Sequence, residues 1–262
     1  MLQPFVLKGG SVLFRTLLAA LVVTGATLAG SSAHAATISF SGSTTNSDGN
    51  AALSAKATFS TVGTQLQIVL ENTANATSMR PSDLLAAIFF DVTGPSLAMA
   101  YVSGTAESLV NHNGTANGGS TNAGSQWAYA HDAASLGGGV TQHYGVGGAG
   151  FGIFGAGVDG ADWLIVTDNF NGGGNLNSNK NPFIKNSITL LLSGLPIDFD
   201  PLASIGNVRF QWGTSLSEPS TSALCLDCTT NFQALATPEP GSLLLLGSGV
   251  VAVSRRFRRR RS

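Results

Sequence analysis

The sequence predicts an all-β fold: a single antiparallel β-sandwich or jelly-roll-like domain between two processing segments. Three observations support this prediction. Short stretches alternate apolar and polar residues, Gly, Asn, Ser and Pro separate them, and no long amphipathic helix follows the N-terminal segment. Only 10% of the 262 residues are charged while 43% are hydrophobic, which supplies a core and counts against a coiled coil or a salt-bridged helical bundle. We expect a signal peptide over residues 1–35, the β-domain over 36–236 and a C-terminal tail over 237–262.

The charges are distributed unevenly along the chain. Between Ala36 and Thr237 there are five Lys and Arg against thirteen Asp and Glu, a net charge of −8, while the remaining basic residues lie near the two ends. An acidic domain repels phosphate backbones, so we expect no nucleic-acid partner.

The first 35 residues have the pattern of a secretory signal peptide. Lys8 and Arg15 precede an apolar run at residues 16–23, and Ala33 and Ala35 form an A-x-A cleavage site. A buried N-terminal helix is the alternative, but the run ends in small residues without amphipathic periodicity. We therefore expect export by the Sec machinery, cleavage by signal peptidase, and a mature chain that begins near Ala36.

The clearest strand is predicted at Thr64–Glu71, where Leu66, Ile68 and Leu70 alternate with polar residues. The run Leu84–Val92 is continuously apolar, so periodicity does not distinguish a buried strand from a helical turn that leads into a strand. The other expected strands share short apolar or alternating patterns bounded by turn residues, and they are Thr37–Ser41, Ala52–Ser60, Leu97–Val102, Trp127–His131, Trp163–Val166, Ile188–Leu192 and Val208–Trp212.

A glycine-rich stretch holds 14 glycines between Gly137 and Gly174. Because apolar residues continue through Gln142–Phe154, we expect tightly turned strands with bulges there. Loops are expected at residues 111–125 and 169–181.

The chain has two cysteines, Cys225 and Cys228. A C-x-x-C pair is also found in redox motifs and in half of a zinc site, but the sequence offers neither a βαβ context nor a second ligand pair. In an exported protein we expect a local disulfide that contributes little stability, because it closes few residues. We expect no metal site at these residues.

The sequence gives little support for catalysis, and we expect no enzyme. His131 and Asp132 are adjacent, so their side chains diverge on a strand; whether His112, His131 and His143 converge cannot be derived from sequence. Carboxylate pairs such as Asp159/Asp162 and Asp198/Asp200 arise readily by chance among thirteen acids.

Two segments leave calcium open as the one cofactor, and otherwise we expect none. Asp159-Gly-Ala-Asp162 and Asp168-Asn-Phe-Asn-Gly172 place oxygen ligands on glycine turns. Neither fits the EF-hand pattern, and turn formation alone accounts for these residues.

The tail begins with Pro238, Glu239 and Pro240, where two prolines keep the backbone extended. An apolar run and an arginine cluster follow. The run, from residue 243 to 253, is short for a bilayer, but arginines behind it favour a temporary membrane anchor with a cytoplasmic charge stop. The anchor residues are Leu243, Leu244, Leu245, Leu246, Val250, Val251 and Val253, and the charge stop comprises Arg255, Arg256, Arg258, Arg259, Arg260 and Arg261.

In this order of features the tail resembles the PEP-CTERM sorting signal of Gram-negative bacteria. The resemblance implies recognition of Pro-Glu-Pro by an exosortase, which removes the tail, and delivery from an inner-membrane intermediate to the cell surface or extracellular matrix. A weaker resemblance, to secreted exosortase-dependent surface proteins, rests on Leu66–Thr73, Pro81–Leu85 and Phe89–Asp91; it implies no activity.

Three functions follow as hypotheses. The first is a structural or interaction protein of the surface, biofilm or exopolysaccharide matrix. The second is a carbohydrate-binding β-sandwich with exposed aromatic residues, and the third and least favoured is a secreted polysaccharide hydrolase. The aromatic candidates are Trp127, Tyr129, Tyr144, Trp163 and Trp212, of which Trp163 and Trp212 lie in apolar alternation and are expected in the core.

Overall fold

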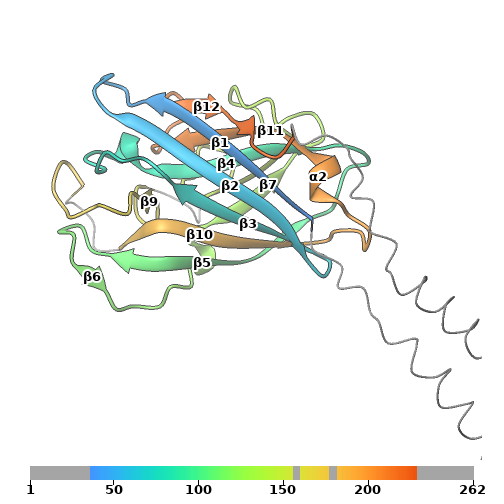
Figure 1. Cartoon of the computed structure of the whole chain (residues 1–262), viewed down its shortest axis with the longest axis horizontal. Coiled ribbons are helices and arrows are strands. Elements are labelled where there is room, and N and C mark those ends of the chain that lie inside the picture. The colour runs from blue at the N-terminus through green and yellow to red at the C-terminus, as the bar shows by residue number, and fades with distance from the viewer. Residues whose placement is uncertain (1–35, 156–159, 177–181, 229–262) are drawn as a thin grey trace, which may run out of the picture. The chain divides into compact units, whose positions relative to one another are not determined.

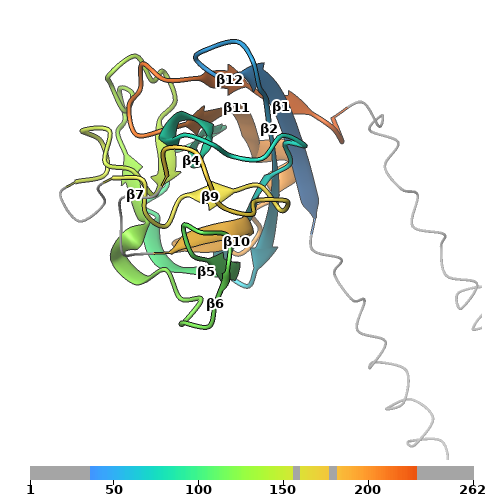
Figure 2. The same cartoon turned by 90° about the vertical axis from the view of Figure 1, so that its left-hand side faces the viewer.

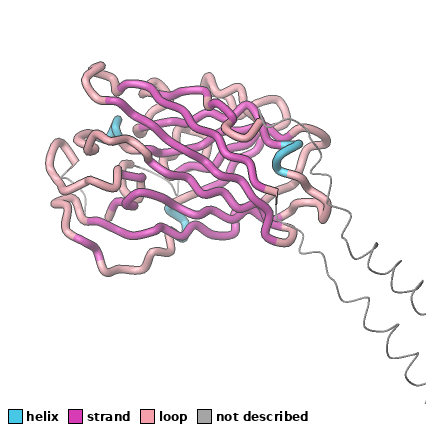
Figure 3. Tube along the Cα trace, viewed as in Figure 1, coloured by secondary structure: helices cyan, strands magenta, loops and turns pink. Residues whose placement is uncertain are grey.

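The computed structural model describes residues 36–155, 160–176 and 182–228, and within them strands dominate (Figure 3). The predicted all-β class is confirmed. The predicted signal helix, its cleavage site at Ala33 and Ala35, and the short membrane helix of the tail lie outside the described residues. Within those three ranges, no helix has the length and apolar character needed to cross a membrane.

In the described part of the chain, the elements follow one another as a run of strands with three short helical turns (Figure 1). Their bounds are β1 Thr37–Thr45, β2 Ala52–Val62, β3 Gln65–Asn72, η1 Pro81–Asp83, β4 Leu85–Val92, β5 Ala100–Val110, β6 Ala116–Asn117, η2 Gly124–Gln126, β7 Ala128–His131, β8 Tyr144–Gly147, β9 Ile165–Val166, β10 Phe183–Ser193, α2 Pro201–Ser204, β11 Ile205–Trp212, β12 Ser220–Ser222 and β13 Leu224–Cys225.

The strands form one hydrogen-bonded sheet that folds back on itself into two layers (Figure 2). One layer contains β13, β1, β2, β3, β10, β5 and β6, and the other contains β12, β11, β4, β8 and β7. β9 joins them, since it pairs with both β4 and β10. On the opposite side β1 contacts β11 and β12, so the layers enclose the core as a sandwich.

The β1–β2–β3 meander shows why the alternating pattern predicted strands. Its apolar residues are buried at every second position, as Leu66, Ile68 and Leu70 are on β3, while Gln65 and Gln67 face outward. One buried apolar face on each strand fixes the register, because a slip by one residue would expose that face.

β4 resolves the ambiguity of the apolar run at residues 84–92. It is a strand buried on both faces: Ile88 and Phe90 enter the main core between the layers, whereas Ala87 and Phe89 pack outward in a separate cluster with Phe154. A strand covered on both sides needs apolar residues throughout, which removes the alternation.

A row of aromatic rings crosses the main core from one layer to the other. Phe40 contacts Phe59 at 5.8 Å, Phe59 contacts Phe90 at 5.3 Å and Phe90 stacks on Tyr144 at 5.7 Å between ring centroids. We call these four residues the ring row. All are at most 4% exposed.

Several details differ from the prediction. The loop expected at residues 111–125 contains the short strand β6, which pairs with the end of β5. The β9–β10 ladder is parallel, because β9 belongs to the segment that crosses between the layers; the other ladders among the described residues are antiparallel. β5 begins at Ala100, later than the predicted Leu97, since Leu97 is held outside the ladder by its N–H donating to the Tyr144 hydroxyl at 3.0 Å.

Of the turned strands with bulges expected over residues 142–154, the structure has one short strand, β8, whose ladders run without a register shift, and residues 148–154 form bends and turns. Bulky neighbours explain the glycines of this segment. A Cβ at Gly147 would lie 2.4 Å from Phe154, and one at Gly148 would lie 2.8 Å from the Trp127 indole. The rings of Phe154 and Trp127 therefore pack directly on the backbone of β8 and the residue after it.

Candidate functional site

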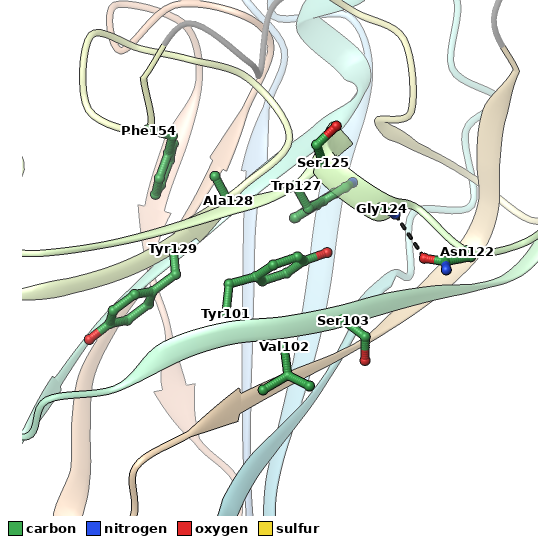
Figure 4. A pocket seen from close by; sticks show the side chains of 10 residues that line it. All are labelled: Tyr101, Val102, Ser103, Asn122, Gly124, Ser125, Trp127, Ala128, Tyr129 and Phe154. Atoms are coloured by element: carbon green, nitrogen blue, oxygen red, sulfur yellow. Dashed lines mark hydrogen bonds between the residues drawn. The ribbon is translucent and has the colours of Figure 1, made fainter.

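An open groove of about 610 Å³ lies where the two layers diverge, between the start of β5 and the η2–β7 segment (Figure 4). Four of its ten lining residues are aromatic. We call it the aromatic groove, and its lining residues are Tyr101, Val102, Ser103, Asn122, Gly124, Ser125, Trp127, Ala128, Tyr129 and Phe154.

The groove exists because β5 is covered along only part of its outer edge. The Ala106 N–H donates to the Thr121 carbonyl, and the Ala123 N–H donates to the Gly104 carbonyl, so the segment before η2 closes this edge. η2 then turns the chain away toward β7. The first residues of β5, including Tyr101 and Ser103, are left at the border of the layer.

Trp127 forms the rigid floor of the groove. Its side chain is 1% exposed, and its indole N–H donates to the Trp163 carbonyl at 2.9 Å. Trp163 itself has φ = 60°, a left-handed conformation that is costly for a bulky residue. Packing around Trp163 thus holds the carbonyl that fixes the indole.

Tyr101 and Tyr129 form the walls. Both side chains are half-buried, and the buried part includes the polar end. Their hydroxyl oxygens are buried without a hydrogen-bond partner among the described residues, so the exposed parts of these side chains are carbon. Burial raises the pKa of Tyr101 to about 12. Burial, with a smaller contribution from Tyr144, also raises the pKa of Tyr129. Both phenols are therefore neutral over the physiological range.

Gly104 allows Tyr101 to lie flat along β5. A Cβ at this position would come within 2.6 Å of the Tyr101 hydroxyl. The ring consequently covers the glycine and lies beside Trp127, as Figure 4 shows.

None of the ten lining residues carries a charge. The groove offers ring faces, the Ser103 and Ser125 hydroxyls and the Asn122 side chain, whose oxygen accepts from the Gly124 N–H at 2.9 Å. This chemistry suits the stacking of a ring with an apolar face and peripheral hydroxyls. It lacks the carboxylate or imidazole that general acid–base catalysis uses.

The structure sorts the five aromatic residues predicted for carbohydrate binding. Tyr129 lines the groove, and Trp127 forms its floor although it is buried. Tyr144 and Trp212 are buried in the core, which corrects the prediction for Tyr144 and confirms it for Trp212. Trp163 is half-buried rather than fully in the core, because it lies at the border of the main cluster.

Tyr101 and Phe154 were not predicted as groove residues. Tyr101 lay within the expected strand Leu97–Val102, where alternation assigns a residue to a face but does not show that the opposite layer ends there. Phe154 was expected to supply core, and it does so in the outer cluster with Phe89 while its edge reaches the groove.

The three histidines of the domain do not converge. The His131 imidazole bonds to the Ser96 hydroxyl at 3.0 Å and stacks on Tyr144, and His112 stacks on Phe183. His143 contacts Asp91. In the described part of the chain, no group of three or more His, Cys, Asp or Glu residues is arranged to hold a metal ion.

Asp91 is the centre of a polar cluster at the end of β4. It accepts from the His143 N–H at 2.8 Å, from the His143 ring at 2.7 Å and from the Asn207 amide at 2.7 Å. Burial alone would raise the pKa of Asp91, but these hydrogen bonds outweigh burial and lower it below the ordinary value. Asp91 therefore joins β4 to β11 and to the residue that precedes β8.

The other segments singled out from sequence have structural contacts. In Pro81–Leu85, buried Asp83 accepts from the backbone N–H groups of Met79 and Arg80 at 2.9 and 3.1 Å. Asp168, from a proposed calcium turn, lies 3.7 Å from Lys185. The neighbouring Asn169 donates to the Asn75 carbonyl at 2.6 Å.

Several of the remaining candidates are exposed or lie outside the described residues. Asp159 and the tail residues 237–262 lie outside them. Asp198 and Asp200 are exposed, and Asp200 caps α2 by accepting from the Leu202 N–H at 3.0 Å.

Cys225 and Cys228 form the expected disulfide. It closes the turn after β13, which pairs with β1. The Ser39 N–H donates to the Asp227 carboxylate at 2.8 Å, and the Leu226 N–H donates to the Ser39 carbonyl at 2.8 Å. The first and last described strands are thereby held side by side.

Comparison with protein-family models decides the nature of the tail, because residues 236–260 match one of them. The chain carries a PEP-CTERM protein-sorting motif. The match includes Pro238, Glu239 and Pro240, the apolar run and most of the arginine cluster. This PEP-CTERM protein is accordingly exported and processed by an exosortase for the cell surface. No curated protein and no solved structure matches the chain.

Proposed function

We propose that this PEP-CTERM protein is a structural or interaction protein of the bacterial surface or of the exopolysaccharide matrix around it. The sorting motif at residues 236–260 is the observation that carries the proposal. A Gram-negative cell provides the setting: the Sec machinery exports the chain, signal peptidase removes residues 1–35, and the inner membrane holds the intermediate.

The tail sequence supports release of the protein in two steps, in which the membrane first retains the intermediate and the exosortase then cuts it. The Pro-Glu-Pro segment cannot continue a helix, because proline lacks a backbone N–H and restricts the residue before it. An extended peptide of this kind is accessible to the exosortase. The arginines from Arg255 onward resist transfer across the membrane, so the intermediate waits there until it is cut.

Mass spectrometry of the C-terminus tests this route in matched strains with and without an exosortase. We expect the surface protein to end near Pro238 in the exosortase strain and to retain Arg255–Arg261 in the strain without it. The variant Pro238→Ala/Pro240→Ala should retain its tail in both strains. Pro196→Ala, which alters an exposed proline outside the motif, serves as the matched control and should be processed normally.

Recovery of the intact chain, arginines included, from the outside of exosortase-bearing cells would refute this route. Export would then rest on the signal peptide alone.

A second function, carbohydrate binding, is favoured by the aromatic groove. Half-exposed rings over a fixed indole offer a surface on which sugars stack, and such binding suits a protein of a polysaccharide matrix. We propose a binding role rather than catalysis, since the ionisable side chains that line the groove are two tyrosines with raised pKa values. Polysaccharide cleavage that is lost in Asp→Asn variants would instead support a hydrolase.

A further inference from the structure

We propose that the aromatic groove binds a neutral polysaccharide in preference to an acidic one, with sugar rings stacked on Tyr101 and Tyr129. The inference rests on the proposed carbohydrate-binding function and names the class of ligand. It is carried by three properties of the groove: the orientation of its rings, its lack of charge and its rigidity.

The orientation of the tyrosines determines which part of a ligand they contact. Both hydroxyls are buried, so neither phenol is directed outward as a hydrogen-bond donor. Ring carbon is what remains exposed. Ring faces carry partial negative charge, and they attract the partly positive C–H groups on the apolar face of a pyranose. Ser103 and Ser125 lie beside them and can pair with the hydroxyls at the edge of the sugar.

Charge then discriminates between neutral and acidic polysaccharides. The ten lining residues are uncharged, so no Lys or Arg compensates the desolvation of a carboxylate, which is costly without a partner. The nearest charges along the two flanking strands are also negative: Glu107 lies on β5 and Asp132 directly follows β7. The domain as a whole has five Lys and Arg against thirteen Asp and Glu. The net negative charge of the domain therefore repels acidic polysaccharides at long range, and their carboxylates find no cationic partner among the lining residues of the groove.

The groove is also organised before a ligand arrives. The Trp127 indole is fixed by the Trp163 carbonyl at 2.9 Å, and the Tyr101 ring rests on Gly104. A surface that is already ordered loses less conformational entropy on binding. Tyrosine suits this role, since it provides a large contact area with few rotatable bonds.

Affinity electrophoresis of the exported protein tests the inference. Native gels contain either a neutral polysaccharide (dextran, galactomannan or hydroxyethylcellulose) or an acidic one (alginate or polygalacturonate). We expect retardation by at least one neutral polymer and none by the acidic polymers. Tyr101→Ala and Tyr129→Ala should each weaken retardation by about tenfold in apparent affinity.

Matched variants separate loss of the ring from loss of the fold. Tyr101→Phe and Tyr129→Phe keep the exposed carbon face, so they should retain wild-type retardation. Phe199→Ala removes a half-buried ring that does not line the groove and should also leave retardation unchanged. Thermal unfolding of each variant identifies any that fail to fold, in which case the phenylalanine variants and the choice of polymer still test the proposal.

The outcomes distinguish this inference from the proposed function. No retardation by any neutral polymer, equal retardation after loss of either ring, or stronger retardation by the acidic polymers would overturn the inference. Stronger retardation by the acidic polymers would leave carbohydrate binding intact but assign the wrong class. The surface role stands or falls separately, on the C-terminal processing experiment.

Discussion

The ring row and the aromatic groove use the same residue types in different ways. In the ring row, Phe40, Phe59, Phe90 and Tyr144 are buried, and their centroids lie 5.3–5.8 Å apart. In the groove, Tyr101 and Tyr129 bury their polar ends and expose carbon. Burying polar atoms without partners while exposing carbon does not favour folding. The row is therefore arranged for stability, and the contrast supports our proposal that the groove contacts a ligand.

The largest loss of stability is expected from a substitution in the ring row. Phe90→Ala removes a fully buried ring that contacts both Phe59 and Tyr144, and we expect it to lower the free energy of unfolding by about 3–5 kcal/mol. Tyr129→Ala, in the groove, should cost less than about half as much, because its ring is already partly in water. Chemical denaturation of the exported protein measures both, and equal losses would show that the two regions do not differ in this way.

Most of the fold could be predicted because it depends on local pattern. Alternation at Leu66, Ile68 and Leu70 defines a strand with one buried face, and the structure has that strand. The nature of Leu84–Val92 could not be predicted, since burial on both faces depends on where Phe154 and the glycine-rich segment pack. Those contacts join residues more than 50 positions apart.

The sorting motif depends on local sequence, whereas the groove depends on contacts between distant segments. Pro238, Glu239, Pro240, the apolar run and the arginines act in linear order, so sequence alone suffices to identify them. The groove depends on where the segment that covers β5 ends. No local feature of Tyr101 shows that β5 lacks a neighbour at its start, whereas Tyr144 carries a similar local signal and is buried.

A smaller difference in stability is expected when the hydroxyl of Tyr144, in the ring row, or that of Tyr101, in the groove, is removed. Tyr144→Phe removes the acceptor of the Leu97 N–H, and an unpaired buried donor costs about 1–2 kcal/mol of stability. Tyr101→Phe removes a hydroxyl without a partner among the described residues, so we expect no loss and at most a small gain. Unfolding midpoints of the two variants measure the difference. Equal losses would imply that the Tyr101 hydroxyl makes a stabilising contact.

The smallest expected effect is a change of stability with pH. The ring row ends beside the ionisable Asp91, whereas no charged residue lines the groove. Asp91 adjoins Phe90, and its pKa in the folded protein is lowered by Asn207 and His143 against the opposing effect of burial. The folded state thus favours the ionised carboxylate. This contribution is fully present above the unfolded pKa of about 3.9 and disappears as the pH falls through the lowered folded value.

We expect Asp91→Asn to cost less than about 1 kcal/mol at pH 7, because the site is partly exposed to solvent, and the gap from wild type should close below about pH 4. Unfolding free energies measured from pH 3 to pH 8 test this slope. The retardation of the protein by a neutral polysaccharide should stay constant from about pH 5 to pH 8, because the tyrosines of the groove remain neutral. A stability gap that persists at pH 3 would assign the role of Asp91 to packing rather than charge. A pH-dependent retardation would mean that an ionisable group outside the lining residues acts on the groove.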